Sequence, residues 1–208
     1  MKYVKYILGF ILVIILSRLI GGQVGRFLAD RANQVSEPTY SLTQYEYTDQ
    51  PSTKIDLPEY ISPKHSFGVR FFTQPSITNY GKIVHYEFGA ETELEAAYNI
   101  FINNYEKPLL TDKAIQGALQ GYLQGRLLLL GEKGKLIYSR EVLFLGQRAL
   151  DYEYTKDIDS TRAYFKGIYI VVEDLGYAVS VTCSEETKKL AYSKYADFVK
   201  SFRLIREH

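Results

Sequence analysis

The chain has 208 residues and a formal net charge of +1, from 25 basic and 24 acidic residues. This balance excludes a protein that binds nucleic acid through its phosphates, because such a surface requires a clear excess of lysine and arginine. The single cysteine, Cys183, excludes an intramolecular disulfide. The charge is uneven along the chain: residues 1–29 carry four basic and no acidic groups, residues 30–64 carry six acidic against three basic groups, and residues 65–208 balance.

The N-terminus is the most apolar part of the chain. Two lysines precede an unbroken apolar run over residues 6–16, which continues less strongly as far as Val24. A helix over the strict run would be only about 16 Å long, whereas one that extends through Val24 approaches the hydrocarbon thickness of about 30 Å. Arg18 lies within the longer span and could reach the headgroups by snorkelling. We therefore predict an uncleaved transmembrane helix within residues 1–29 that contacts the lipid bilayer through residues 6–24.

A cleaved signal peptide is the competing interpretation of this segment. The strict apolar run has the length of a signal-peptide core, although no Ala-x-Ala-like cleavage site follows it. Cleavage would release a secreted domain, whereas an uncleaved helix leaves a single-pass membrane protein. Basic residues flank the segment on both sides, so the positive-inside rule gives little direction. A short basic N-terminus before a long folded domain favours a domain on the periplasmic or extracellular side.

Residues 30–64 are predicted to be an acidic linker between the anchor and a globular domain over residues 65–208. Four prolines interrupt regular structure, and serine, threonine, glutamine and acidic residues fill the intervals. Four tyrosines of the linker could dock on the domain, and we expect its last ten residues to be the more ordered part. The prolines are Pro38, Pro51, Pro58 and Pro63, and the tyrosines are Tyr40, Tyr45, Tyr47 and Tyr60.

The domain opens with the alternation of apolar and polar residues that is typical of β-strands. Strands are predicted over residues 66–72, before the break at Pro75, and over residues 81–90 and 96–104. The acidic start of the third piece is helix-like, so its type stays open at this point. Four more strands are predicted over a later stretch, with turn residues between them. These are residues 135–145, 146–155, 161–172 and 177–183.

The clearest helix lies between the two groups of strands. Thr111 or Asp112 can cap its start, and apolar residues recur at helical spacing as far as Leu130. Three glycines at four-residue spacing, from Gly117 to Gly125, form a strip beside the apolar face. They cost the helix about 3 kcal/mol relative to alanine. We expect close approach of the helix backbone to a sheet to offset that cost.

A last helix runs to about Lys200, after residues Thr182 to Glu185, which fit a capping box. Its apolar stripe consists of Ala191, Tyr195, Phe198 and Phe202. Adjacent strands joined by short turns imply a largely antiparallel sheet, and both helices must bury their apolar stripes on it. The predicted fold is therefore α+β, with a sheet of about six to seven strands packed by two helices.

Motifs along the domain resemble those of a known superfamily in their order. They are Phe67-Gly-Val-Arg-Phe71 with Pro75, Ala114-Ile-Gln-Gly117-Ala-Leu-Gln-Gly121, Leu145-Gly-Gln-Arg-Ala149, Thr161-Arg162-Ala-Tyr and Phe198-Val-Lys-Ser-Phe-Arg-Leu204. This pattern of spacing and turn residues, over residues 65–205, resembles the PsbP-like superfamily of α/β/α sandwiches. The superfamily includes extrinsic photosystem subunits, Ran-binding import factors and many bacterial domains of unknown role. The resemblance implies a non-enzymatic module that binds or stabilises a partner, and it carries over no functional residue.

Two groups of side chains are candidates for metal sites. His85 and Glu87 share a strand face and could ligate zinc if a third ligand approached, but the spacing of His65, His208 and Cys183 supplies none. A partly exposed strand pair is the simpler interpretation. Four acidic residues could hold calcium, but they lack the EF-hand spacing and its glycine, so a solvated hairpin turn is preferred. These residues are Asp151, Glu153, Asp157 and Asp159.

No catalytic pattern is present. There is no Gly-x-Ser-x-Gly nucleophile elbow, and no glycine-rich phosphate loop follows a strand, because the glycine series lies inside a helix. Cys183 is in phase with the apolar residues of its strand, so we expect a buried, inert thiol. The sequence therefore assigns no catalytic, cofactor-binding or metal-binding residue, and it implies no cofactor.

These observations predict a membrane-anchored, non-enzymatic binding module of the cell envelope. It would present a sheet edge or a tyrosine-bearing surface to an envelope protein partner. The alternative is an enzymatic or small-ligand-binding domain with a cleft beside the sheet. A deep pocket with convergent polar side chains would favour that alternative, and a flat apolar patch would favour the binding module.

Overall fold

The structure is a computed structural model that describes residues 43–45, 57–91, 96–131, 134–158 and 161–205. The predicted membrane segment and most of the predicted linker therefore lie outside the described residues. Within the described ranges, neither helix is both long enough and apolar enough to cross a bilayer. The boundaries of anchor, linker and domain stay predictions.

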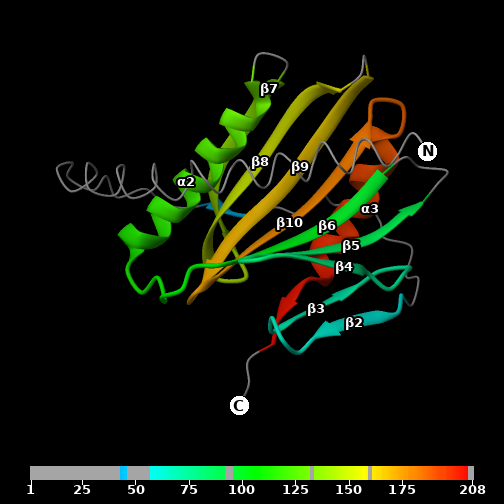
Figure 1. The fold of residues 1–208 in the computed structure, drawn as a ribbon. Helices are drawn as coiled ribbons and strands as arrows, with labels where there is room; N and C mark the ends of the chain where they lie inside the picture. The colour runs from blue at the N-terminus through cyan, green and yellow to red at the C-terminus, as the bar shows by residue number, and fades with distance from the viewer. Residues whose placement is uncertain (1–42, 46–56, 92–95, 132–133, 159–160, 206–208) are drawn as a thin grey trace.

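A twisted, eight-stranded sheet forms the centre of the described fold (Figure 1). All neighbouring strands run antiparallel except the short β1, which pairs in parallel with β7. The turn between β7 and β8 is tight, and Leu145 and Gly146 both have positive φ angles there, of 52° and 74°. The spatial order is β1 (Thr43–Gln44), β7 (Gly134–Phe144), β8 (Gln147–Ile158), β9 (Thr161–Val172), β10 (Leu175–Ser184), β6 (Ala96–Asn104), β5 (Ile83–Glu91) and β4 (Ser76–Tyr80).

A second, three-stranded sheet lies near the C-terminal end of the last helix, α3 (Lys188–Ser201) (Figure 1). Its order is β11 (Arg203–Leu204), β3 (Phe67–Arg70) and β2 (Glu59–Ser62), and all pairs are antiparallel. Phe67 of β3 is completely buried and stacks on Phe202 at a centroid distance of 5.9 Å. The small sheet therefore closes one end of the apolar core beneath α3.

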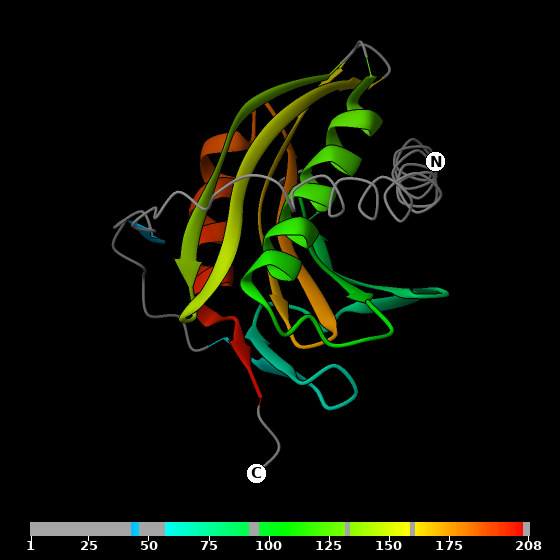
Figure 2. The ribbon, with the colours of Figure 1, turned by 90° about the vertical axis from the view of Figure 1, so that its left-hand side faces the viewer.

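The two helices of the described region cover opposite faces of the large sheet, which gives α/β/α layers (Figure 2). The helix α2 (Asp112–Leu130) packs on β7, β8 and β9, and α3 packs on β10 and β3. Each face has its own core. Phe198 and Tyr195 belong to the core under α3, and Leu119 belongs to the core under α2. The central strands are consequently apolar on both faces, which is why their sequences read as continuous apolar runs.

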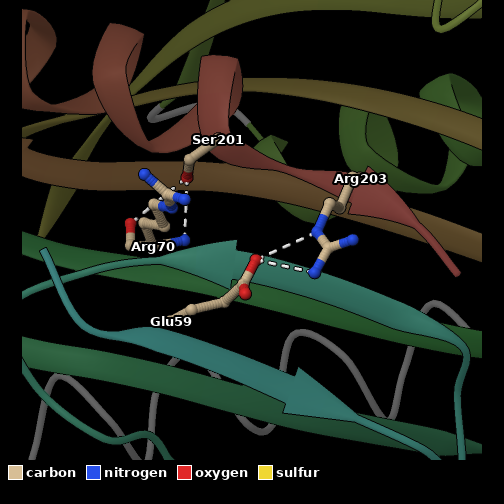
Figure 3. A network of polar contacts seen from close by, with 4 residues as sticks. All are labelled: Glu59, Arg70, Ser201 and Arg203. Atoms are coloured by element: carbon tan, nitrogen blue, oxygen red, sulfur yellow. Dashed lines mark hydrogen bonds and ion pairs between the residues drawn. The ribbon is translucent and has the colours of Figure 1, made fainter.

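Contacts from four residues fasten the small sheet to the end of α3 (Figure 3). Ser201 Oγ accepts a hydrogen bond from the backbone N–H of Arg70 at 2.9 Å and lies 3.2 Å from the Arg70 carbonyl oxygen. Arg203 places both Nε and Nη2 2.9 Å from Glu59 Oε1. This ion pair is partly exposed, so it contributes at most about 1 kcal/mol. The link between Ser201 and the β3 backbone is the more specific of the two.

The predicted strands and both predicted helices are confirmed, including the strand at residues 96–104, which is β6. Thr111 caps α2, with its side chain accepting a hydrogen bond from Ala114 N–H at 3.2 Å. Two linker tyrosines dock on the domain as expected. Tyr45 packs edge-on against Phe144 at 5.6 Å, and Tyr60 packs on the aromatic core beside β3.

The predicted number of strands is wrong, because the described residues form eight strands in the large sheet and three in a separate one. Four short strands, β1, β2, β4 and β11, were not predicted, since none of them shows a clear apolar alternation. The predicted capping box is also wrong. Thr182 lies inside β10, and α3 begins only after Thr187, whose backbone N–H approaches Ser184 Oγ at 3.4 Å in the intervening turn.

The glycine strip of α2 does not behave as predicted at its first position. A Cβ atom added to Gly117 would meet nothing within 4 Å, so no element packs closely against it. Gly125, two turns later, is buried. Close approach to the sheet therefore cannot explain Gly117.

We expect Gly117→Ala to stabilise the domain by about 1 kcal/mol, because alanine restricts the unfolded chain and has open space in the helix. The free energy of unfolding in urea measures the effect. Gly146→Ala is the matched control. A Cβ there also finds open space, but its φ of 74° disfavours alanine, so this variant should lose stability. A loss of stability in Gly117→Ala would contradict the interpretation.

We expect Ser201→Ala to destabilise the domain by about 1 kcal/mol, because it leaves the Arg70 N–H without its hydrogen-bond acceptor. Ser193→Ala, in the same helix, changes the same atoms away from the small sheet and should be neutral or slightly stabilising. Urea unfolding compares the two variants. Equal stabilities would show that the link in Figure 3 contributes nothing measurable.

Candidate binding surface

His85, one of the two side chains considered for zinc, contacts neighbouring residues of the domain. His85 Nε2 lies 2.7 Å from Asn99 Oδ1, and its ring stacks on Phe101 at 4.2 Å. Burial lowers the pKa of His85 and raises that of Glu87. His85 is thus buried, so the prediction of a partly exposed strand pair is wrong for this residue. Among the residues that the structure describes, no three His, Cys, Asp or Glu side chains converge as a metal site would require.

The four acidic residues proposed as a solvated turn are in fact divided. Asp151 and Glu153 are buried on the α3 face of β8, whereas Asp157 is exposed and pairs with Arg162 at 3.0 Å. Asp159 lies outside the described residues. Strand alternation places residues 151, 153 and 157 on the same face of β8, and Asp157 is exposed because it lies next to the end of the strand.

Asp151 is tied to the neighbouring strand. Tyr138 Oη donates a hydrogen bond to Asp151 Oδ1 at 3.1 Å, and Arg140 Nε donates to Oδ2 at 3.0 Å. Burial raises the pKa of Tyr138, and the carboxylate of Asp151 raises it further, so the phenol stays protonated and keeps donating. Asp151 therefore holds β7 to β8 through these two contacts.

Cys183 lies in the core under α3, as predicted. Burial raises the pKa of its thiol to about 12, so the thiolate is scarce at neutral pH. This is the environment of an inert structural cysteine.

Arg126 is buried beneath α2, a feature that the sequence did not indicate. Its guanidinium lies 5.0 Å from the ring centroid of Tyr122 and 5.7 Å from that of Phe101. Tyr122 Oη shares a 2.8 Å hydrogen bond with Tyr152 Oη, and burial raises the pKa of Tyr152 well above its usual range. This polar layer lies within the contact between α2 and the sheet. It therefore explains part of the high tyrosine content structurally.

A shallow hollow of about 310 Å³ lies where the β4–β5 turn meets the turn between β2 and β3. Most of the side chains around it are polar, and Lys82 forms an ion pair with Glu106 at its rim. The full lining is Lys64, His65, Asn79, Gly81, Lys82, Val84, Ile102, Asn104 and Glu106.

His65 is the most strongly fixed residue of this hollow. Its Nδ1 lies 2.6 Å from Tyr86 Oη, which also lies 3.0 Å from Ser62 Oγ. Tyr177 Oη donates a hydrogen bond to the His65 carbonyl oxygen at 2.9 Å. Burial lowers the pKa of His65, and Lys64 lowers it further, so the imidazole is neutral at pH 7. The hollow thus presents a rigid, neutral hydrogen-bonding group.

Strand β4 borders the hollow and forms one margin of the large sheet. Among the described residues it pairs only with β5, and Asn79 of β4 contributes to the lining of the hollow. The strand is exposed and uncharged, and Ile77 is 50% exposed. Sheet edges are usually protected by charged residues, by bulges or by proline. Within β4 there is none of these devices, since Pro75 lies just before its first residue.

Comparison with known proteins supports the fold only. No protein-family model matches the sequence, and neither does any curated protein. The solution structure of cyanobacterial PsbP from Synechocystis sp. PCC 6803 is similar, with a TM-score of 0.54 and 10% identity over 83% of this chain and 99% of that one. The chain therefore has a PsbP-like fold, as its motifs predicted.

Two other solved structures match more loosely. A protein from Bacteroides thetaiotaomicron is 9% identical with a TM-score of 0.44, over 74% of this chain and 50% of that one. A Pseudomonas aeruginosa protein of unknown function, described as a putative regulator, is 11% identical with a TM-score of 0.44, over 73% of this chain and 99% of that one. The present chain spans only half the length of the Bacteroides protein. Neither match bears on function.

Proposed function

We propose that the chain is a membrane-anchored, non-enzymatic module of the cell envelope that binds an extended segment of a protein partner along β4. The observation that carries this proposal is the exposed, uncharged margin of β4 next to a hydrogen-bonding hollow. The anchor rests on the apolar run at residues 6–24, and the periplasmic or extracellular placement rests on the short basic N-terminus before the domain.

The backbone of β4 supplies the first part of the interaction. In an antiparallel pair, alternate residues of the outer strand turn their N–H and C=O groups away from the neighbour. An incoming strand would pair with these groups, each hydrogen bond contributing about 1 kcal/mol net. Since β4 is only five residues long, this pairing alone gives modest affinity.

Side chains supply the second part. Ile77 and Asn79 pair in register with Tyr86 and Val84, so both lie on the face of the sheet that turns towards α3. The hollow opens on this face beside Asn79. Alternate side chains of a bound strand would lie against Ile77 and reach the hollow, where His65 can hydrogen-bond one of them. Specificity would then come from one apolar and one polar contact.

Replacing Ile77 with lysine tests whether the edge strand β4 binds the partner. We expect Ile77→Lys to weaken partner binding by at least about tenfold, because it adds a charge and removes an apolar contact at the edge. A photo-crosslinker at position 77 of the membrane-bound full-length chain identifies the partner. Affinity for the cross-linked segment is then measured, and slower amide exchange in β4 on binding reports strand pairing.

Ile61→Lys is the matched control, because Ile61 is 48% exposed on β2, an edge of the other sheet. It should leave the affinity unchanged. Equal weakening by both variants, or unchanged β4 exchange on binding, would refute the role of β4. A small molecule recovered from the hollow, in place of a cross-linked segment, would support the ligand-binding alternative.

Anchoring has its own expected outcome. We expect the full-length chain to remain in the membrane pellet after a carbonate wash, with an intact mass that includes residues 1–29. A reporter fused after His208 should be active only outside the cytoplasm. A soluble chain that begins after residue 29 would show instead that the segment is a cleaved signal peptide.

A further inference from the structure

Three side chains surround a lysine at the first turn of α3, away from β4. Lys188 Nζ lies 2.9 Å from Glu153 Oε1, 4.2 Å from the Tyr164 ring centroid and 5.1 Å from that of Tyr192. The Glu153 carboxylate is buried on β8, and the two rings come from β9 and α3. Glu153, Tyr164 and Tyr192 are called the acidic–aromatic cluster below.

The hydrogen bonding of this cluster is incomplete. Glu153 Oε1 and Tyr192 Oη are both buried, and neither makes a hydrogen bond of standard geometry among the described residues, although the Glu153 carboxylate lies close enough to Tyr192 to raise the pKa of its phenol. Lys188 is within ion-pair distance of Oε1, yet its direction does not satisfy hydrogen-bond geometry. Buried polar atoms usually find a partner, so these two could accept one more donor group.

Lys188 occupies this position despite an unfavourable location in its helix. It is the first residue of α3, whose first turn has no acidic residue, and Thr187 provides no side-chain cap. The positive end of the helix dipole disfavours a lysine here. The attraction of the acidic–aromatic cluster for an ammonium group must therefore outweigh that effect. The side chain of Lys188 is nevertheless 34% exposed, so it can leave without unfolding the domain.

A buried carboxylate with aromatic walls is the chemistry that recognises an ammonium group. A second cation supports this reading, because Lys166 Nζ lies 5.2 Å from the Tyr192 centroid. We propose that the acidic–aromatic cluster is a recognition site for a lysine side chain of a protein partner, and that Lys188 fills it in the free chain. Binding would exchange one ammonium for another, so the partner is selected by a protruding lysine. The site is independent of β4, from which β5, β6 and β10 separate it in the sheet.

Vacating the site tests the proposal. Lys188→Ala should bind Nα-acetyl-lysine methylamide at least about tenfold more tightly than the unaltered full-length chain does, because the internal competitor is gone. Titration is followed through the NMR signals of the Tyr164 and Tyr192 rings. Lys189→Ala is the matched control, since Lys189 is the exposed next residue and should leave the affinity unchanged. The norleucine analogue of the probe, which lacks the ammonium group, should not bind.

Adding Glu153→Gln to Lys188→Ala should abolish the gain. Lys188→Ser vacates the same site and suits the start of a helix, so it replaces Lys188→Ala if the latter unfolds. Equal affinity of the Lys188 variants and the unaltered chain would overturn the proposal. So would equal binding of the norleucine analogue, which would indicate an apolar gap alone.

Discussion

Two glycines in the central strands make room for the tyrosine rings that join the sheet to α2. A Cβ on Gly167 would collide with the ring of Tyr152, and one on Gly176 would collide with that of Tyr169. Gly167 and Tyr152 are direct cross-strand partners of β9 and β8. Because these rings lie over glycine, their hydroxyls reach outward to α2 and to the loop before it. The hydroxyl of Tyr152 lies 2.8 Å from that of Tyr122, and the hydroxyl of Tyr169 lies 2.5 Å from that of Tyr105.

The opposite face of the sheet, which α3 covers, contains two ion pairs whose carboxylates are buried. There the interior contains two carboxylates, each held by a cation from a neighbouring element, Arg140 on β7 and Lys188 on α3. Both cations are partly exposed, so removing one of them would lower the stability of the domain without requiring it to unfold. The two faces of one sheet therefore differ in kind, with a shared layer of phenols under α2 and ion pairs beside α3.

Sequence reasoning succeeded where burial dominates. The runs that became β9 and β10 are apolar on both faces, and the stripe of α3 faces a single core, so hydrophobic spacing located all three. It failed at β4, which is exposed along its length and so lacks any alternation to detect. It also grouped Asp151 and Glu153 with Asp157 as one solvated turn, although all three lie in β8 and only Asp157, next to the end of the strand, is exposed.

Other features had no signal in the sequence. An arginine in the middle of α2 is expected on the exposed face, but Arg126 is buried beside Tyr122 of its own helix and two tyrosines of β8, Tyr152 and Tyr154. Likewise, the hollow beside His65 is formed by three turns that are distant in sequence. The helices and most strands could thus be predicted from hydrophobic spacing. The candidate binding surface could not, because it forms only when segments distant in sequence come together.

The short strand β1 pairs with β7 at one edge of the large sheet, on the opposite side from β4. Thr43 and Gln44 cover the outer edge of β7, and the backbone N–H of Tyr45 extends this contact to the Leu143 carbonyl oxygen at 2.8 Å. β1 therefore occupies one lateral edge of the eight strands, and β4 occupies the other, about 34 Å away across seven strand spacings. The first strand of the described chain and the strand proposed to bind a partner are thus separated by the full width of the sheet.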